Sequence, residues 1–250
     1  MNGTDFMLTK IIAHRGSKGI RPENTLPAFE KAIDEGADGI ETDVHMSKDG
    51  HLIIMHDETV DRTTDGTGRI FDKTLAELKQ LDAGGYFGYE FLGTRIPTLD
   101  EVVKFLIEKN YKGLFNLELK TDKIQYPGIE EKVSTYMAQQ KVPFQLVYSS
   151  FHPQSLVKMH TLDPDIEFAS LFKVQTKFAR KFYRSRLVKD WHPDIRWVRA
   201  HRFFLPHVQL RPWTVNSTDD MRYCFKRHFD GIITDYPGRA SIIRRSIQGG

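Results

Sequence analysis

The stretch that decides the fold is residues 38–45, with the sequence DGIETDVH. Ile40 and Val44 alternate with polar residues at a period of two, which predicts a β-strand. Glu41 and Asp43 are two residues apart, so their side chains share one face of that strand. Neighbouring carboxylates disfavour each other's ionisation, and such hard oxygen ligands suit Mg²⁺ or Ca²⁺. Taken alone, the pair also fits an exposed strand with two solvated acids.

Strands and helices alternate on both sides of this stretch. The clearest of the later strands is residues 113–120, where Asn116, Glu118 and Lys120 share one face. Other strands are predicted at 10–14, 52–57, 144–149, 166–171, 208–215 and 231–234, and helices at 25–35, 98–109, 129–140, 153–161, 219–227 and 240–247. Repeated strand–helix units imply a parallel sheet with right-handed crossovers. With 250 residues, the pattern predicts a TIM (β/α)₈ barrel in a single domain spanning residues 1–250.

Two segments depart from this rhythm. Residues 58–95 follow the second strand, are rich in aromatic residues and contain one predicted helix at 74–81. They are too long for an ordinary loop, which predicts a small insertion over the barrel mouth. Residues 172–207 predict one helix at about 175–187 but no regular sixth strand–helix unit.

Bulk composition limits the classes of function. Lys and Arg number 36 against 33 Asp and Glu, and this small net charge of +3 gives no case for nucleic-acid binding. The single cysteine, Cys224, excludes an internal disulfide and is typical of a reducing compartment. The first ten residues contain no long apolar run, and no stretch reaches the length of a membrane span. We therefore expect a cytoplasmic protein without a transmembrane segment.

Polar residues gather where the predicted strands end. In a barrel of this type, the active site lies at the carboxyl ends of the strands. Each of these residues has an ordinary structural alternative, such as a salt bridge, a hydrogen-bonded histidine or a core tryptophan. Their joint placement at strand ends makes that explanation unlikely for the set, which comprises His14, Arg15, Glu41, Asp43, His56, Glu118, Lys120 and Trp213.

This set of residue types predicts phosphodiester cleavage. A divalent cation held by Glu41, Asp43 and Glu118 would polarise an anionic oxygen. Arg15 and Lys120 add positive charge for the non-bridging oxygens of a phosphate. His14 and His56 titrate near neutral pH, so one accepts a proton from the nucleophile while the other donates one to the leaving group. The chain contains neither a Gly-x-Ser-x-Gly elbow nor a glycine-rich nucleotide loop.

Several short motifs follow one another along almost the whole chain. They are AHRG at 13–16, PENT at 22–25, ETDV at 41–44, SKDG at 47–50, HD at 56–57, DRTT at 61–64, RIPTL at 95–99, NLELK at 116–120, WTVN at 213–216 and DGIITDYP at 230–237. With these motifs the chain resembles the glycerophosphodiester phosphodiesterase family. The resemblance is most specific between His14 and His56.

The resemblance implies a metal-dependent TIM barrel that hydrolyses deacylated phospholipids to an alcohol and sn-glycerol 3-phosphate. It implies a general acid–base pair, a set of metal ligands, two phosphate contacts and an apolar wall for the glycerol or head group. At the matching positions, the resemblance implies that His14 and His56 are the acid–base pair and that Glu41, Asp43 and Glu118 are the metal ligands. It implies that Arg15 and Lys120 contact the phosphate and that Trp213 forms the apolar wall. The expected cofactor is one divalent cation, Mg²⁺ or Ca²⁺, and the expected partner is a small glycerophosphodiester.

Two polar residues lie in phase with the proposed metal ligands. His45 is in phase with Asp43, and we expect it to be a neighbour at the rim rather than a ligand. Asn116 is in phase with Glu118, and we expect it to form a hydrogen bond inside the barrel.

Alternative activities on the same fold stay open. A lysophospholipase D is favoured by Trp213 and the aromatic insertion, which could accommodate an acyl chain. The bacterial phosphatidylinositol-specific phospholipase C lacks the carboxylate triad found here, and the venom phospholipase D relatives depend on disulfides that one cysteine cannot supply.

A peripheral membrane or anion-binding module is the alternative from another class. Val174, Phe178 and Phe182 follow helical spacing among seven basic residues, as in a basic amphipathic helix. We favour instead an outer barrel helix that packs its Phe face inward and solvates its charges.

Overall fold

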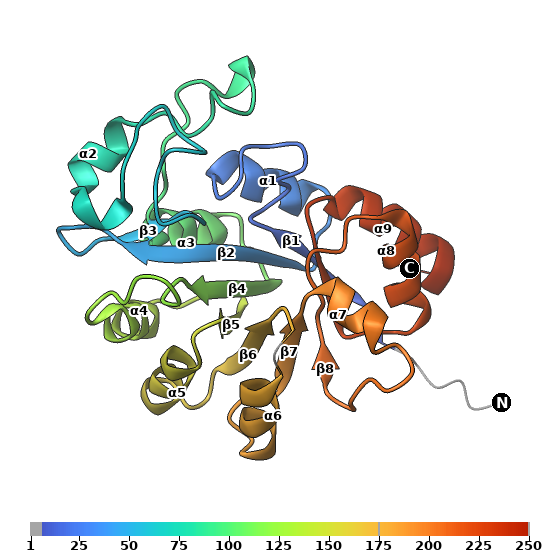
Figure 1. Cartoon of the computed structure of the whole chain (residues 1–250). Helices are drawn as coiled ribbons and strands as arrows, with labels where there is room; N and C mark the ends of the chain where they lie inside the picture. Colours follow the sequence, from blue (N-terminus) through green and yellow to red (C-terminus); the bar gives the residue numbers. More distant parts are fainter. Residues whose placement is uncertain (1–6, 175, 250) are drawn as a thin grey trace.

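The computed structural model describes residues 7–174 and 176–249. In this part of the chain, eight parallel strands form one curved sheet: β1 (Lys10–His14), β2 (Gly39–Met46), β4 (Leu114–Leu119), β5 (Gln145–Ser150), β6 (Glu167–Phe172), β7 (Asp190–Pro193), β8 (Gln209–Leu210) and β9 (Gly231–Thr234). The strand order is β8-β7-β6-β5-β4-β2-β1-β9. The chain therefore folds as a nearly closed, TIM-like α/β barrel, as its sequence predicts (Figure 1).

Backbone hydrogen bonds outside the regular ladders bring the two ends of the sheet together. Ile233 N donates to the carbonyl of Pro212 at 2.9 Å, and Val215 N donates to the carbonyl of Ile233 at 2.9 Å. The predicted strand over 208–215 is shortened to β8 because Pro212 has no N–H to donate. Trp213 thus lies beyond the strand and is joined to Asp194 by one isolated bridge. This corrects the expectation that Trp213 belongs to the predicted strand 208–215.

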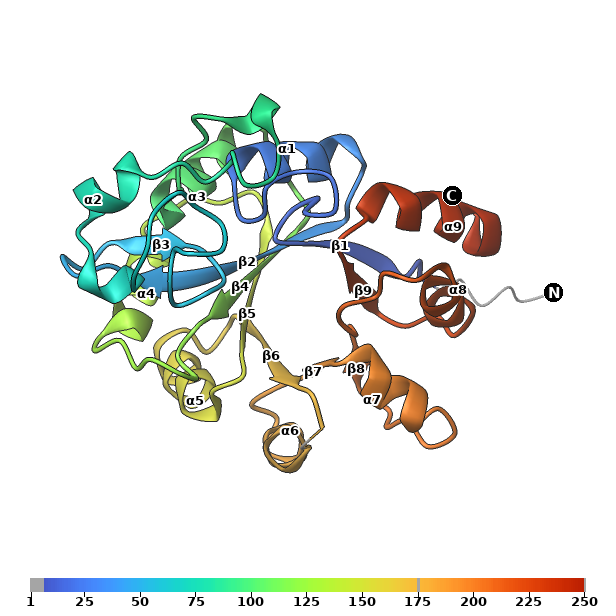
Figure 2. The same ribbon diagram turned by 45° about the horizontal axis from the view of Figure 1, so that its top comes forward.

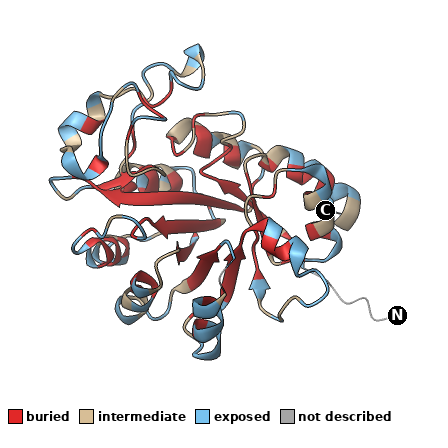
Figure 3. Cartoon of the chain, in the orientation of Figure 1, coloured by how far each residue is buried: buried red, intermediate tan, exposed pale blue. Residues whose placement is uncertain are grey.

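Helices cover the outside of the barrel (Figure 2). They are α1 (Leu26–Asp34), α3 (Leu99–Glu108), α4 (Ile129–Ala138), α5 (Pro153–Leu162), α6 (Lys177–Arg184), α7 (Ile195–Ala200), α8 (Thr218–Lys226) and α9 (Pro237–Gln248). The strands are buried almost throughout, while the helices turn exposed faces outward (Figure 3). None of the helices among the described residues combines the length and the apolar character needed to cross a bilayer.

The sheet has an inner and an outer side, and side chains alternate between them. The outward residues Ile40, Val44, Phe115 and Leu117 belong to the large core under the helices. The inward residues form a smaller apolar layer inside the barrel: Ile12, Leu114, Val147, Ala169 and Ile233. His14, Glu41, Asp43 and Glu118 have the inward phase and follow this layer toward the carboxyl ends of their strands.

The insertion at residues 58–95 has its own short elements and core. After β3 (Leu52–Ile54), which pairs antiparallel with β2, come η1 (Ile70–Asp72), α2 (Leu75–Gln80) and η2 (Tyr89–Phe91). Thr74 and Glu77 form a reciprocal capping box that starts α2 where the helix is predicted. A separate apolar cluster, including Val60, Ile70 and Leu78, holds the segment together beside β3 (Figure 1).

The region 172–207 does contain a sixth strand–helix unit. The predicted helix appears as α6, and its predicted first residue, Gln175, lies outside the described residues. The sixth unit is the short strand β7 followed by the short helix α7. It is short but regular enough to continue the parallel sheet between β6 and β8, so the expectation that no regular sixth unit exists is wrong.

Candidate active site

Three carboxylates from two neighbouring strands meet inside the rim of the barrel. In the pairing of β2 with β4, Asp43 lies opposite Glu118 and Glu41 opposite Asn116. One oxygen each from Glu41, Asp43 and Glu118 lies within 4.8 Å of the others, and all three residues are buried. The parallel register therefore brings together the three residues that the sequence predicts as metal ligands.

The electrostatics of these carboxylates fit a bound cation. Burial raises the pKa of Glu41 well above its usual range, and the charges of Asp43 and Glu118 raise it further. Burial likewise raises the pKa of Glu118. Burial opposes ionisation of Asp43, but Lys120 and Arg15 outweigh it and lower the pKa of this carboxyl. Asp43 Oδ1 is buried and has no hydrogen-bond donor among the described residues, so it is available as a ligand.

Two cations and an amide hold the triad in place. Arg15 Nε lies 3.5 Å from Asp43 Oδ2, and Lys120 Nζ lies 3.6 Å from Asp43 Oδ1. Lys120 Nζ also donates to Glu118 Oε1 at 2.9 Å. Asn24 Nδ2 donates to Asp43 Oδ2 at 2.8 Å. Both predicted phosphate contacts thus face the triad, where they offset part of its negative charge.

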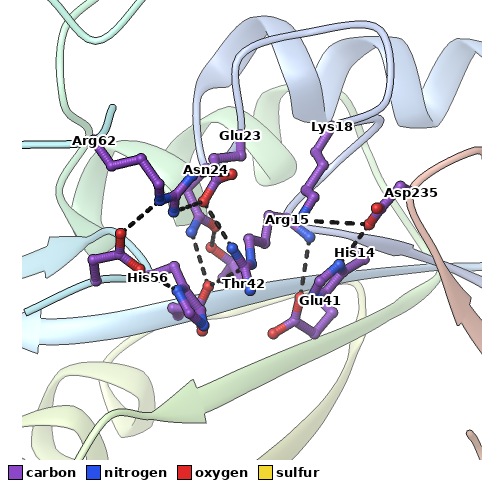
Figure 4. Close-up of polar contacts among 12 residues, drawn as sticks. His14, Arg15, Lys18, Glu23, Asn24, Glu41, Thr42, His56, Arg62 and Asp235 are labelled. Atoms are coloured by element: carbon purple, nitrogen blue, oxygen red, sulfur yellow. Dashed lines mark hydrogen bonds and ion pairs between the residues drawn. The ribbon is translucent and has the colours of Figure 1, made fainter. Parts of the chain in front are cut away.

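His14 is oriented by a carboxylate from the far end of the chain. Its Nδ1 lies 2.6 Å from Asp235 Oδ1, and its Nε2 lies 4.0 Å from Glu41 Oε2 (Figure 4). Burial, with help from the charge of Arg15, lowers the pKa of His14 to about 4, which corrects the expectation that this histidine titrates near neutral pH. The imidazole is therefore neutral at neutral pH, and a hydrogen bond from Nδ1–H to Asp235 leaves the Nε2 lone pair facing the site.

The turn after β1 is shaped for close contacts. Arg15 takes a left-handed backbone conformation with φ of 55°, and its N–H donates to Glu41 Oε2 at 3.0 Å. Gly16 has φ of 78°, and a Cβ there would come within 2.6 Å of the Ala28 backbone. Only glycine fits this approach without moving α1.

His56 belongs to a chain of ionic contacts that leads back to Arg15. Its Nδ1 lies 2.6 Å from Asp57 Oδ1, and Arg62 Nε donates to Asp57 Oδ2 at 2.6 Å. Arg62 also binds Glu23, which in turn accepts from Arg15 Nη1 at 2.8 Å (Figure 4). The insertion therefore reaches the site through Arg62, and a carboxylate orients each of the two histidines through Nδ1.

A cleft opens beside these residues. It has a volume of about 680 Å³, and its lining includes Arg15, His56 and Lys120. Its apolar walls include Phe151, Leu171, Phe172, Phe178 and Trp213. A smaller pocket of about 40 Å³ lies deeper and is lined by Glu41, Glu118 and both histidines. The described lining of the cleft contains no residue of the insertion 58–95.

Trp213 forms a fixed part of this cleft wall. Its indole Nε1 donates to the carbonyl of His192 at 2.7 Å, and its ring meets Phe151 edge-on with centroids 5.4 Å apart. Both contacts leave an apolar ring surface toward the site.

His45 and Asn116, the two polar residues in phase with the predicted metal ligands, differ in their hydrogen bonding. His45 is fully buried, with Nδ1 2.8 Å from the Tyr126 hydroxyl and Nε2 3.1 Å from the carbonyl of His56. Both ring nitrogens are thus occupied away from the triad. The prediction that Asn116 forms a hydrogen bond inside the barrel is wrong. Its amide is buried in the deep pocket and has no hydrogen-bond partner among the residues described.

The sequence reasoning assigned no role to the carboxylates that orient the histidines. Asp235 directly follows β9, which pairs with β1, so its position at a carboxyl strand end is the signal that points to His14. Asp57 has no comparable signal beyond its place next to His56.

Comparison with known proteins identifies this arrangement. The model of the glycerophosphoryl diester phosphodiesterase family matches residues 14–239. A glycerophosphodiester phosphodiesterase of Caldanaerobacter subterraneus is 42% identical, over 92% of this chain and 96% of that protein. A glycerophosphodiester phosphodiesterase of Bacillus altitudinis is 39% identical, over 96% of this chain and all of that protein (100%).

Solved structures agree with these matches. The structure of an Oleispira antarctica phosphodiesterase, in complex with the product sn-glycerol-3-phosphate, superposes with a TM-score of 0.80 at 31% identity. The superposition covers 94% of this chain and 96% of that one. The chain therefore belongs to the glycerophosphodiester phosphodiesterase family of phosphoric diester hydrolases.

Proposed function

We propose that the protein hydrolyses glycerophosphodiesters to an alcohol and sn-glycerol 3-phosphate, with His14 and His56 as the acid–base pair. The observation that carries this proposal is the geometry of the rim: three buried carboxylates within 4.8 Å, with two carboxylate-oriented histidines that share a pocket with Glu41 and Glu118. The sn-glycerol-3-phosphate complex of the Oleispira antarctica relative supports the choice of product.

Glu41, Asp43 and Glu118 would hold one divalent cation, Mg²⁺ or Ca²⁺, because both prefer carboxylate oxygens. When bound, the cation supplies Lewis-acid polarisation of a phosphate oxygen. Arg15 and Lys120 both line the cleft next to Asp43 and neutralise the remaining phosphate charge. Trp213 packs against the glycerol or the head group and excludes water from one side.

The histidines move the protons. Each has a carboxylate at Nδ1, so each presents Nε2 to the substrate. One Nε2 accepts a proton from the attacking water, the bond between phosphorus and the alcohol oxygen breaks, and the other Nε2 donates a proton to the departing alkoxide. Asp235 holds the neutral ring of His14 in the tautomer with its proton on Nδ1.

A turnover assay on glycerophosphocholine and glycerophosphoethanolamine tests the proposal. We expect release of sn-glycerol 3-phosphate that stops on addition of a chelator and that falls by orders of magnitude in Glu41→Gln and His56→Ala. Asp219→Asn, at an exposed position on α8, is the matched control and should retain full activity. Turnover that is indifferent to the chelator contradicts the metal assignment, and full activity of His56→Ala contradicts the acid–base assignment.

A lysophospholipase D-like activity is the second candidate, and the size of the cleft favours it. At about 680 Å³, the cleft lies in the range that encloses a drug-sized ligand, which leaves room for more than a deacylated head group. Its apolar wall is formed by Phe151, Phe172 and Phe178 rather than by the aromatic insertion. Parallel assays on glycerophosphocholine and lysophosphatidylcholine decide between the two substrates by their kcat/KM.

We also propose that the chain forms one phosphodiesterase domain, since β1 and β9 pair near opposite ends of the chain. The insertion has its own small core but reaches the site only through a few contacts such as Arg62. A cytoplasmic location is proposed on the basis of the single cysteine, Cys224, which is free and buried. Fractionation of the producing cells tests the location.

A further inference from the structure

The positive charge of the molecule is concentrated in one segment. Residues 173–204 contain ten of the 36 basic residues and two of the 33 acidic residues. This segment therefore carries a charge of +8, whereas the rest of the chain carries −5. All ten basic residues are exposed, and the two acids, Asp190 and Asp194, are buried. So strong an asymmetry within a nearly neutral protein indicates a polyanionic partner for this sector.

Helix α6 presents its cations as a stripe. It buries Ala179 and Phe182, which the helical period of 3.6 residues places on one side. The same period places Lys177, Arg180, Lys181 and Arg184 on the opposite side, within an arc of about 100°. The helix packs Phe182 inward as predicted, but Phe178 remains 46% exposed, so its apolar residues are only partly covered.

The stripe has few acidic partners. Arg196 and Arg199 of the neighbouring α7 are paired with Asp194 and Asp220. In contrast, no salt bridge to a described acidic residue involves the four α6 cations, nor Lys173 before α6, nor Arg202 in the loop after α7. Six exposed charges therefore form no salt bridge with the acidic residues described, and only Lys173 is near enough to Asp194 to lower its pKa.

Exposed phenylalanines stand next to these charges. Phe203 and Phe204, in the loop after α7, are 76% and 89% exposed, and Arg202 lies over the Phe203 ring at 4.6 Å. The loop reaches α6, because the Tyr183 hydroxyl donates to the carbonyl of His207 at 2.9 Å. Phe204 lines a hollow of about 180 Å³ together with α6 side chains. Figure 2 shows α6 and this loop on the outside of the barrel.

We propose that this surface binds an anionic lipid bilayer. We define the basic surface as Lys173, Lys177, Arg180, Lys181, Arg184, Arg202, Phe203 and Phe204. The cations lie against anionic head groups, and the two phenylalanines enter the head-group region, the pairing of features found in interfacial binding. A convex helix with adjoining apolar rings suits a lipid surface better than the grooved, base-stacking site of a nucleic-acid binder.

The docking surface adjoins the catalytic cleft. Lys173, Val174 and Phe178 line the cleft that contains His56, and α6 continues from there to the exposed loop. A bilayer on the basic surface would therefore lie near the cleft mouth. The proposal itself does not depend on catalysis, because binding is measured without substrate.

Cosedimentation with large unilamellar vesicles tests whether the basic surface binds an anionic bilayer. We expect binding to vesicles of equal parts phosphatidylglycerol and phosphatidylcholine, little binding to pure phosphatidylcholine, and weaker binding when salt rises from 0.1 to 0.5 M. Each basic residue at an anionic membrane contributes about fivefold, so the double variant Lys181→Gln/Arg184→Gln should bind about 25-fold more weakly. Phe203→Ser/Phe204→Ser should bind about tenfold more weakly through the lost apolar contact.

The control is Lys112→Gln/Lys132→Gln, which removes two exposed lysines from another sector and should bind like the parent protein. Hydrolysis of a water-soluble glycerophosphodiester should be equal in all three double variants, which shows that they fold. The proposal is overturned if the parent protein does not sediment with anionic vesicles, if the α6 variant binds as tightly as the control, or if duplex DNA at equal phosphate concentration displaces the vesicles completely.

Discussion

The contact between His14 and Asp235 gives a sharp prediction for Asp235→Asn. The carboxylate lies 2.6 Å from Nδ1 of His14, and its other oxygen accepts from Asn216 at 2.8 Å. Asparagine keeps the size of this side chain but loses its charge. Its amide can donate to Nδ1, which turns the imidazole into the tautomer with its proton on Nε2. That tautomer cannot accept a proton at the face of the site.

The size of the effect follows from the hydrogen bond that is lost. A hydrogen bond to a charged group contributes about 1.5–3 kcal/mol. The bond between Asp235 and His14 is strongest when the imidazole becomes protonated during the reaction, because both partners are then charged. If that energy is lost only in the transition state, kcat falls by about 10- to 150-fold while KM changes little. Burial already lowers the pKa of His14 to about 4, and the loss of Asp235 lowers it further.

Steady-state kinetics on glycerophosphocholine between pH 5 and 9 measure this prediction. Asp219→Asn makes the same chemical change at an exposed site and should leave kcat unchanged. Thermal unfolding of both variants reports any change in the fold. If Asp235→Asn retains kcat within twofold of the parent protein, His14 does not depend on this carboxylate, and the orienting role is refuted.

Acid pH and two substitutions provide further predictions. Three buried histidines have lowered pKa values, about 4 for His14 and His45 and about 3 for His192, in each case with burial as the main cause. Between pH 7 and pH 5 the unfolded chain therefore binds more protons than the folded one, whereas Asp190, whose pKa burial raises to about 9, acts in the opposite direction. Glu41 and Glu118, whose pKa values burial also raises, act in the same direction as Asp190, so the histidine effect is isolated with His192→Gln. In urea unfolding with chelator, the parent protein should lose about 2 kcal/mol more unfolding free energy than this variant between pH 7 and pH 5, and equal losses would contradict the reasoning. Phe115→Ala removes a fully buried ring from the outer core and should cost about 3–5 kcal/mol in the same assay; a loss below 1 kcal/mol would contradict the packing described. Trp213→Ala removes one cleft wall and should raise KM for glycerophosphocholine about tenfold with a smaller change in kcat, and an unchanged KM would exclude a binding role.

The barrel and its acidic rim could be predicted because their signals are local. Alternation at a period of two places Glu41 and Asp43 on one face, and Asn116 and Glu118 on one face of another strand. Parallel strands then bring carboxyl ends to the same edge, which is enough to predict that the triad converges. The register that sets Asp43 opposite Glu118 is not encoded in either strand alone, and it emerges only from the closed sheet.

The parts that escaped prediction depend on contacts distant in sequence. β7 has the sequence DWHP, with buried Asp190 and His192 where an ordinary strand would have apolar residues. Asp190 can be buried there because Arg211, from the next unit, lies 3.1 Å away. The pairing of His14 with Asp235 likewise joins residues 221 positions apart. No local pattern reports such partners.

The central claim is that Glu41, Asp43 and Glu118 jointly bind one divalent ion. Isothermal titration of Mg²⁺ and, separately, of Ca²⁺ into the chelator-treated protein measures this directly, with Glu41→Gln as the comparison. The account predicts one ion per chain and an affinity that falls at least tenfold in Glu41→Gln, because a ligand is lost from a site of three. Absence of binding by either ion, or equal affinity of the variant and the parent protein, would contradict it.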